Sequence, residues 1–183
     1  MKQTTINNQA INNEPEWHTP EFENIPDELK TQPWAVWQAE PRLDKDGKPT
    51  GKWNKAPRNP LTGMKVGANQ PEKFGTFEEA MKAYKERNLS GVGVLLTGNG
   101  ILGIDIDDGP KTLKSRPEVR EWLEKAINDG AYCEISPSGK GFRLFTQGEL
   151  SPNSRKKDGT LEIYDRDRFL TVTGNKVSGG SND

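Results

Sequence analysis

The sequence predicts a mixed fold of helices and strands (α+β), organised as one domain with a tail at each end. Two patterns alternate along the chain: short apolar runs rich in β-branched and aromatic residues, and two longer segments with apolar residues at helical spacing. At 183 residues the chain is long enough to bury one substantial core. We expect the domain at residues 26–177, a disordered or loosely attached arm at 1–25, and a Gly/Ser-rich linker or tail at 178–183.

Composition narrows the classes of protein that this chain can represent. The formal net charge is −1, so any contact with nucleic acid must come from a local basic patch. The single cysteine, Cys133, lies in an apolar run and permits no internal disulfide, which favours a buried thiol and a cytosolic setting. No apolar run is long enough to span a bilayer, so we expect a soluble intracellular protein.

The first ordered elements should be a short helical turn at 25–29, a strand at 33–38 and a hairpin with its tip at 44–51. The segment 52–60 then combines three cations with two prolines and a tryptophan. These charges are either solvated in a loop or form a phosphate-binding edge, because cations on a proline-braced segment suit phosphate contacts. The candidate residues for contacting nucleic acid are Lys52, Lys55 and Arg58.

Two amphipathic helices follow from capping signals. The sequence from Thr76 to Glu79 forms a capping box, and the helix that it starts should end near Asn88. A second capping box, Ser115 to Glu118, predicts a helix that ends at Gly130. Its expected core face carries Val119, Trp122, Leu123, Ala126 and Ile127.

The most informative stretch is an apolar pair of strands at 92–96 and 101–106. The joining residues 97–100 include Asn-Gly, which predicts a tight hairpin. Asp105 and Asp107 stand two residues apart at the end of the second strand, so their carboxylates project from one side, roughly 7 Å apart. Two such carboxylates repel each other unless a cation lies between them, and a divalent metal would satisfy this need.

Downstream of this strand, a polar loop joins two strand-like runs at 131–135 and 142–145. The loop offers hydroxyls, backbone N–H groups and an ammonium, which suits a triphosphate or phosphodiester, although a flexible hairpin tip is the simpler alternative. It lacks the spacing of a P-loop and precedes a strand. The candidate residues are Ser136, Ser138, Gly139 and Lys140.

The last strands supply a third carboxylate. Residues 161–164 alternate, which places Glu162 and Tyr164 on one face; a solvent-facing carboxylate is the alternative. A charged turn at 165–168 precedes a strand at 169–174. His18, the only histidine, falls in the N-terminal arm and is expected to be solvated, which leaves no histidine in the domain.

Three acids with a phosphate-binding loop suit nucleotidyl transfer assisted by Mg²⁺ or Mn²⁺. The spacing alone does not distinguish synthesis from hydrolysis. The motifs, in order, are Trp-x-x-Trp, Gly-Lys-Trp-Asn-Lys-x-Pro, Gly-Val-Gly-Val-Leu-Leu, Gly-Ile-Asp-Ile-Asp-Asp, Glu-Ile-Ser-Pro-Ser-Gly-Lys-Gly, Leu-Glu-Ile-Tyr and Arg-Phe-Leu-Thr-Val-Thr-Gly. Over residues 26–177 this order resembles the primase-polymerase domain of the archaeo-eukaryotic primase superfamily, in its phage and plasmid branch.

The resemblance implies an archaeo-eukaryotic primase-like fold, with antiparallel or mixed sheets, a unit like the RNA-recognition motif and flanking helices. It implies catalytic and metal-binding roles for Asp105, Asp107 and Glu162. The implied nucleotide-binding residues are Ser136, Ser138, Gly139, Lys140, Arg143 and Arg168. The implied partners are a single-stranded DNA template, a dNTP or NTP, and a fused or separate replicative helicase, in a bacterial or virus-infected host cytoplasm.

One position departs from the family pattern. The second motif usually ends in histidine, and this chain has Arg143 there. Arginine can bind a triphosphate with two hydrogen bonds, but it stays protonated and cannot accept a proton or bind metal. We therefore keep three hypotheses: a DNA primase-polymerase, an inactive module that recruits a helicase or recognises an origin, and a two-metal nuclease.

Overall fold

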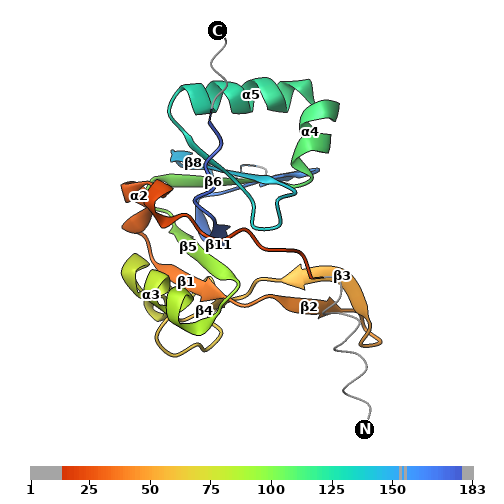
Figure 1. Cartoon of the computed structure of the whole chain (residues 1–183). Coiled ribbons are helices and arrows are strands. Elements are labelled where there is room, and N and C mark those ends of the chain that lie inside the picture. The colour runs from red at the N-terminus through yellow and green to blue at the C-terminus, as the bar shows by residue number, and fades with distance from the viewer. Residues whose placement is uncertain (1–13, 153, 155, 179–183) are drawn as a thin grey trace.

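The computed structural model of the chain describes residues 14–152, 154 and 156–178, and it places two antiparallel sheets one above the other (Figure 1). The first sheet has the strand order β11-β5-β1-β4, and the second has the order β7-β8-β6-β10-β9. A separate two-stranded sheet, β2-β3, extends to one side. These antiparallel sheets with flanking helices confirm the α+β class.

The described part of the N-terminal half contains four helical segments and five strands, four of which are consecutive. In chain order, these elements are η1 (Phe22–Asn24), α2 (Asp27–Lys30), β1 (Trp34–Trp37), β2 (Glu40–Leu43), β3 (Pro49–Asn54), β4 (Pro57–Arg58), η2 (Pro71–Lys73), α3 (Phe77–Arg87) and β5 (Gly91–Thr97). The C-terminal half contains β6 (Ile101–Ile106), α4 (Gly109–Ser115), α5 (Pro117–Asn128), β7 (Tyr132–Ile135), β8 (Phe142–Gln147), β9 (Lys157–Asp158), β10 (Leu161–Tyr164) and β11 (Arg166–Val172).

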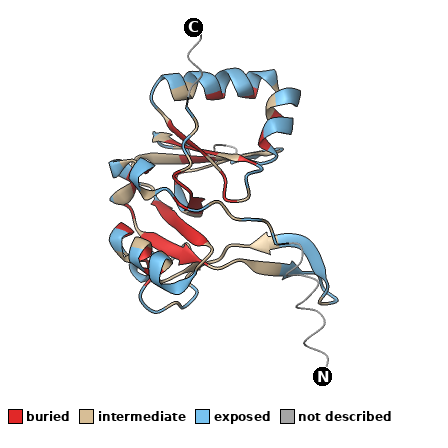
Figure 2. Ribbon diagram, viewed as in Figure 1, coloured by how far each residue is buried: buried red, intermediate tan, exposed pale blue. Residues whose placement is uncertain are grey.

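The central strands of the first sheet, β1 and β5, are buried except for Thr97 at the end of β5 (Figure 2). Helix α3 covers one face, and its start is the predicted capping box: the Thr76 hydroxyl accepts from the Glu79 N–H, and the Glu79 carboxylate accepts from the Thr76 N–H. Phe77 packs edge-on against Trp34, with ring centroids 5.0 Å apart. The helix predicted at 76–88 is therefore confirmed.

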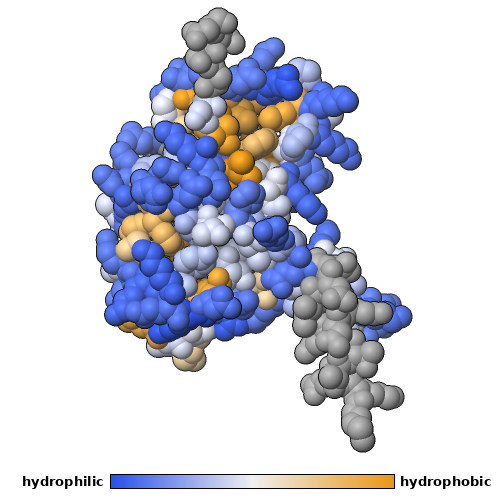
Figure 3. Space-filling view, viewed as in Figure 1, coloured by the Kyte–Doolittle hydropathy of each residue, from blue (hydrophilic) through white to orange (hydrophobic). Residues whose placement is uncertain are grey.

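The second sheet packs its outer face against α4 and α5, where apolar side chains gather at the junction (Figure 3). Val119 and Leu123 from α5 are buried there, as predicted, but Trp122 is 41% exposed. The prediction of a second capping box at Ser115 to Glu118 is wrong. Ser115 ends α4, and Arg116 takes the N-cap position of α5 without a side-chain cap, because the Glu118 carboxylate accepts from the Arg116 guanidinium.

The predicted hairpin between β5 and β6 is also wrong, although both strands exist. β5 lies in the first sheet and β6 in the second, so residues 98–100 carry the chain from one sheet to the other. Gly103 on β6 lets the two sheets approach closely, since a Cβ at this position would lie 2.4 Å from Leu170 Cδ1 and 2.9 Å from Leu96 Cδ1. The hairpin prediction failed because both partners of β5, β1 and β11, are distant in sequence.

The N-terminal segment at residues 14–25 packs on the domain, contrary to the expectation of a loose arm; residues 1–13 lie outside the described part of the chain. The Glu21 N–H donates to the Thr173 carbonyl at 2.8 Å, and Ile25 is buried. Phe22 packs edge-on against Phe77, with centroids 6.0 Å apart. The segment was expected to be disordered because it contains few apolar residues, but two of those few, Phe22 and Ile25, pack against the domain. No helix within the described ranges is long and apolar enough to cross a membrane.

Candidate functional site

A row of charged side chains crosses the inner face of the second sheet, which faces the first sheet. Strand register places Glu134 opposite Arg143, Arg143 opposite Asp105, Asp105 opposite Glu162, and Glu162 opposite Lys157. These five residues come from five adjacent strands, β7, β8, β6, β10 and β9. The signs alternate along the row except at Asp105 and Glu162, where two carboxylates face each other.

Arg143 joins this row to the first sheet. Its side chain is 9% exposed, and its Nε donates to Asp105 Oδ1 at 3.2 Å. Its Nη1 donates to the Thr171 carbonyl at 2.7 Å and also to the Thr171 hydroxyl. In this arrangement the guanidinium serves the protein itself, so its assignment as a triphosphate clamp stays a prediction.

Glu134 is a buried carboxylate beside Arg143. It accepts hydrogen bonds from the Tyr132 hydroxyl at 2.7 Å, from the Thr173 N–H at 3.0 Å and from the Gly174 N–H at 2.9 Å. Burial raises the pKa of Glu134 to about 7, although these hydrogen bonds and Arg143 favour the charged form. Glu134 therefore holds the end of β11 against β7.

Glu162 has several polar partners at the opposite end of the row. It accepts from the Tyr164 hydroxyl at 2.9 Å and from Arg168 Nη2 at 3.0 Å, and it also pairs with Lys157. The hydrogen bond from Lys157 is the main reason that the pKa of Glu162 lies below its usual value. The Arg168 guanidinium lies over the Tyr164 ring, 4.4 Å from its centroid. The predicted shared face of Glu162 and Tyr164 is confirmed.

Asp107 lies one residue beyond the end of β6, where its N–H donates to the Thr160 carbonyl at 2.9 Å. Although this residue is exposed, the surrounding protein desolvates its carboxylate enough to raise the pKa, and the charges of Asp105 and Glu162 raise it further. The three predicted acids are therefore near enough to repel one another. On the other side of β6, Ile104 and Ile106 are buried, as the alternation predicts.

Lys55 reaches this acidic group from the connection between β3 and β4. Burial lowers the pKa of Lys55, and the Arg143 charge lowers it further, whereas Asp105 and Asp107 act in the opposite direction. Its Nζ also lies 5.1 Å from the centroid of the Trp17 ring. Lys55 thus lies near enough to Arg143, Asp105 and Asp107 for their charges to act on its ammonium.

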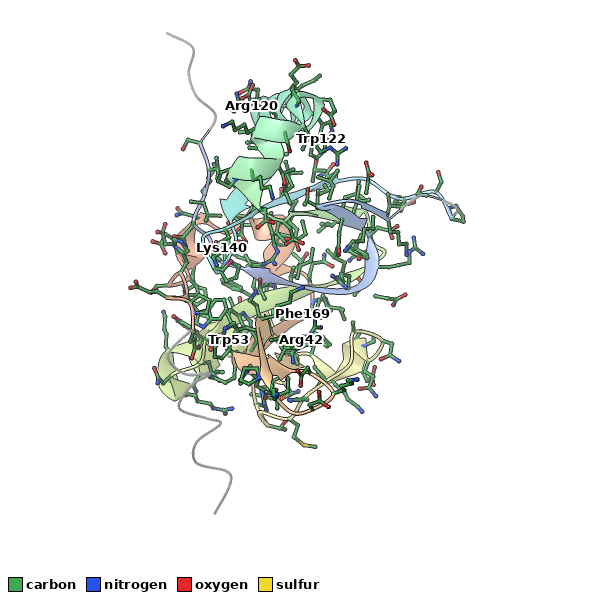
Figure 4. All side chains as sticks on the ribbon, turned by 90° about the vertical axis from the view of Figure 1, so that its right-hand side faces the viewer. Arg42, Trp53, Arg120, Trp122, Lys140 and Phe169 are labelled. Carbon is green, nitrogen blue, oxygen red and sulfur yellow. The ribbon has the colours of Figure 1, made fainter. Side chains whose placement is uncertain are left out.

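The predicted phosphate loop at residues 136–141 forms a tight turn next to the acids. The Gly109 N–H, two residues after Asp107, donates to the Lys140 carbonyl at 2.8 Å. The Ser136 hydroxyl accepts from the Gly141 N–H at 3.0 Å, so this hydroxyl holds the turn. Ser138 is half-buried and Lys140 is exposed. In Figure 4, Lys140 lies at a height between helix α5, which carries Arg120 and Trp122, and the part of the molecule that carries Trp53.

Two predicted basic residues lie elsewhere. Arg58 on β4 donates to the Glu40 carboxylate at 2.6 Å and to the Gly63 carbonyl at 3.0 Å, so its guanidinium stabilises the base of the hairpin. Lys52 is exposed on β3, in the hairpin that extends away from the two main sheets. The site therefore gathers Lys55 but not Arg58 from the predicted basic segment.

Hard divalent ions such as Mg²⁺ and Mn²⁺ prefer oxygen ligands. Asp105, Asp107 and Glu162 supply such ligands, and the raised pKa of Asp107 indicates an excess of negative charge. In the present side-chain positions, no three His, Cys, Asp or Glu side chains within the described ranges form a group able to hold a metal. Arg143 and Arg168 engage two of the three carboxylates. The oxygen atoms of these residues thus suit a divalent metal, whereas their present positions are those of ion pairs with the Arg143 and Arg168 side chains.

Sequence reasoning missed two members of the row, Glu134 and Lys157. A glutamate between apolar residues in a predicted buried strand, as in Tyr-Cys-Glu-Ile, was the available signal for Glu134. Lys157 stood in a basic loop, and only the pairing of β9 with β10 brings it opposite Glu162.

Comparison with known proteins gives one informative match. The chain is 30% identical over 154 residues to a DNA primase-polymerase of Nitratiruptor phage NrS-1. The match covers 80% of this chain and 20% of that protein, so the chain spans about a fifth of the length of its relative. No family model matches the chain.

Proposed function

Since the similarity to a phage DNA primase-polymerase supports assigning this chain to the primase-polymerase family, we propose that the domain synthesises primers on single-stranded DNA. The reaction is nucleotidyl transfer. The 3′-hydroxyl oxygen of one nucleotide attacks the α-phosphorus of a bound dNTP or NTP, a new phosphodiester bond forms, and pyrophosphate leaves as the bond to its bridging oxygen breaks. The role in phage or plasmid replication, with a fused or separate replicative helicase as partner, belongs to the same proposal.

One observation carries this proposal: the row of charges stops alternating where Asp105 and Glu162 are opposite each other. Like charges directly opposite in a sheet are destabilising, and Asp107 adds a third negative charge. Adjacent carboxylates would only weaken a row of ion pairs that served stability alone. A site for divalent cations requires them, because the carboxylates must be in place before the ion binds.

The residues around the acids have complementary tasks. A divalent ion held by Asp105, Asp107 and Glu162 would supply positive charge for the attacking hydroxyl and for the leaving pyrophosphate. The Arg168 side chain is 42% exposed, so it can move from Glu162 to the triphosphate with little change in packing. Lys55 and the turn at 136–141 approach the acids from other sides and bind phosphate oxygens. Arg143 is buried and keeps Asp105 oriented.

The test is incorporation of labelled dNTPs and NTPs on single-stranded templates with Mg²⁺ or Mn²⁺. We expect Asp105→Asn and Glu162→Gln each to lower incorporation by at least about 100-fold, the usual size of a lost electrostatic contribution in phosphoryl transfer. Glu124→Gln, an isosteric change at an exposed position of α5, is the matched control and should retain full incorporation.

Absence of incorporation by the unmutated chain with every template and both metals would reject the proposal. Degradation of the template in the presence of metal, without added nucleotide, would indicate a nuclease instead. Loss of incorporation in Glu124→Gln would show that the assay reports general damage to the protein.

A second candidate is a binding module without catalysis, and the ion pairs of the site favour it. Asp105 and Glu162 are already neutralised by Arg143, Arg168 and Lys157, so the row can be stable without metal. This alternative predicts single-strand or origin binding that is unchanged by EDTA and by Asp105→Asn. A titration with labelled DNA separates it from the polymerase.

A further inference from the structure

The N-terminal segment runs between the two main sheets and passes beside the turn at 136–141 (Figure 1). The His18 N–H donates to the Pro137 carbonyl at 2.9 Å, which fixes the segment to the turn. Asn175 Nδ2 donates to the Thr19 carbonyl at 3.0 Å, and the Glu21 N–H donates to the Thr173 carbonyl. Three successive contacts therefore determine where His18 lies.

The imidazole of His18 contacts the exposed tip of this turn. A Cβ at Gly139 would lie 3.0 Å from His18 Nε2 and 3.6 Å from Cδ2, so only glycine leaves room for the ring without a shift. Gly139 also has φ of +73°, which favours glycine independently. The turn that carries Ser138 and Lys140 is thus shaped to receive a side chain from the N-terminal segment.

The imidazole nitrogens remain available to a ligand. Within the described ranges, neither nitrogen of His18 has a hydrogen-bond partner, and the ring is half-buried. The same turn carries two further donors, the Ser138 hydroxyl and the Lys140 ammonium, whereas the Gly139 N–H already donates to the Ser136 carbonyl at 2.8 Å. The turn is joined to the chain just after Asp107, because the Lys140 carbonyl accepts from the Gly109 N–H. Such a set of donors suits an anion with several oxygens.

The preceding residue attaches the same segment on the other side of the site. The Trp17 ring lies edge-on to Trp37, with centroids 5.3 Å apart, and edge-on to Trp53 at 6.4 Å. Lys55, which faces the acids, lies over the Trp17 ring. Trp17 and His18 therefore connect the two basic sides of the site, one through Lys55 and the other through the turn.

We propose that His18 is a nucleotide-binding residue that donates a hydrogen bond to the triphosphate held by the turn at 136–141. Trp17 acts as a positioning residue for Lys55. This inference rests on the proposed function, since it adds one residue to the same nucleotide site. It replaces the expectation that His18 is solvated, and it explains why the segment before the first helix is attached at so many points.

The chain contains a single histidine, which permits a direct test on the unmutated protein without a histidine tag. The imidazole ¹H and ¹⁵N NMR signals belong to His18 without further assignment. We expect them to shift on titration with dTTP in Ca²⁺, and to remain unchanged with thymidine at the same concentration. Signals that do not respond to dTTP while dTTP binds, as measured by calorimetry, would overturn the inference.

A variant gives the second measurement. His18→Gln keeps the backbone hydrogen bond to Pro137, and we expect it to weaken dTTP binding about tenfold, the size of one hydrogen bond to a charged group. Binding of thymidine and of single-stranded DNA should not change. Glu16→Gln, an exposed change in the same segment, is the control.

The outcomes separate this inference from the proposed function. Equal dTTP affinity in His18→Gln and the unmutated chain, or an equal loss for dTTP and thymidine, would reject the contact with phosphate while leaving the polymerase proposal intact. If the unmutated chain binds no triphosphate at all, the proposed function fails and the inference fails with it.

Discussion

The two faces of the second sheet are built from alternate residues of the same strands, yet they have opposite chemistry. The outer face carries Ile104, Ile106 and Leu144 against α4 and α5, and all three are at most 1% exposed. The inner face carries Asp105 and Arg143 at the intervening positions. Apolar packing makes the outer face tolerant of apolar residues of similar volume, whereas each charge on the inner face depends on its neighbour across the strand.

This difference shows why the site can be stable before it binds a ligand. Apolar side chains on the outer face hold the strands in register, and that register fixes which charges meet on the inner face. Two residues before Asp105, the inner face is apolar. Phe145 lies opposite Gly103 there and packs in the core between the sheets. The charged row is therefore confined to the end of β6 that approaches Lys55 and the turn.

The largest expected effect on stability comes from removing the central cation of the row. Arg143→Met leaves the Asp105 carboxylate without its ion-pair partner and removes the cation opposite the buried Glu134, so we expect the free energy of unfolding to fall by about 3–5 kcal/mol. Urea denaturation measures it. Adding Asp105→Asn to this variant should recover part of the loss; a loss below about 1 kcal/mol in Arg143→Met would show that the two faces differ less than we infer.

A substitution on the outer face should have a smaller and purely structural effect. Leu144→Ala creates a cavity beneath α5 and should lower the free energy of unfolding by about 3 kcal/mol. Triphosphate affinity per folded molecule should stay the same, because Leu144 points away from the row. A large change in affinity at unchanged folding would mean that the two faces are coupled.

The buried carboxylate of Glu134 should make stability depend on pH. Its pKa rises from 4.5 to about 7 on folding, so its contribution is fully present below pH 4.5 and is lost as the pH rises to about 7. The change is at most a few kcal/mol, since one pKa unit corresponds to about 1.4 kcal/mol. Denaturation at a series of pH values should show this decline in the unmutated chain and a flatter profile in Glu134→Gln. Parallel profiles for the two proteins would contradict it.

The smallest effect concerns the outermost layer. Trp122 is 41% exposed on α5, so Trp122→Gln should lower the free energy of unfolding by about 1 kcal/mol or less. Leu123→Ala, at the buried neighbouring position, should cost about 2–3 times as much. Thermal unfolding of both variants ranks them, and the reverse order would restore Trp122 to the core face that the helical spacing predicted.

Much of the fold was predictable where the signal is local. The helix after Thr76, the strand at Trp34–Trp37 and the buried Cys133 follow from capping, β-propensity and apolar runs. The helix α4 and the true start of α5 were missed because Pro117 separates two helices within one amphipathic stretch. The Asn-Gly signal at residues 99–100 predicted a hairpin, since turn chemistry carries no information about which strands pair.

By itself, the sequence determined the residue types of the site: the alternation that continues one residue past β6 predicts Asp105 and Asp107 on one side and Ile104 and Ile106 on the other. Only the tertiary structure decided which charged residues lie opposite Asp105. Strand pairing places Arg143 and Glu162 there, and these residues are 38 and 57 positions further along the chain. It also decided that His18 lies against Gly139. Such pairings depend on the burial of the outer face and on the course of the whole chain, and neither is encoded in any local pattern.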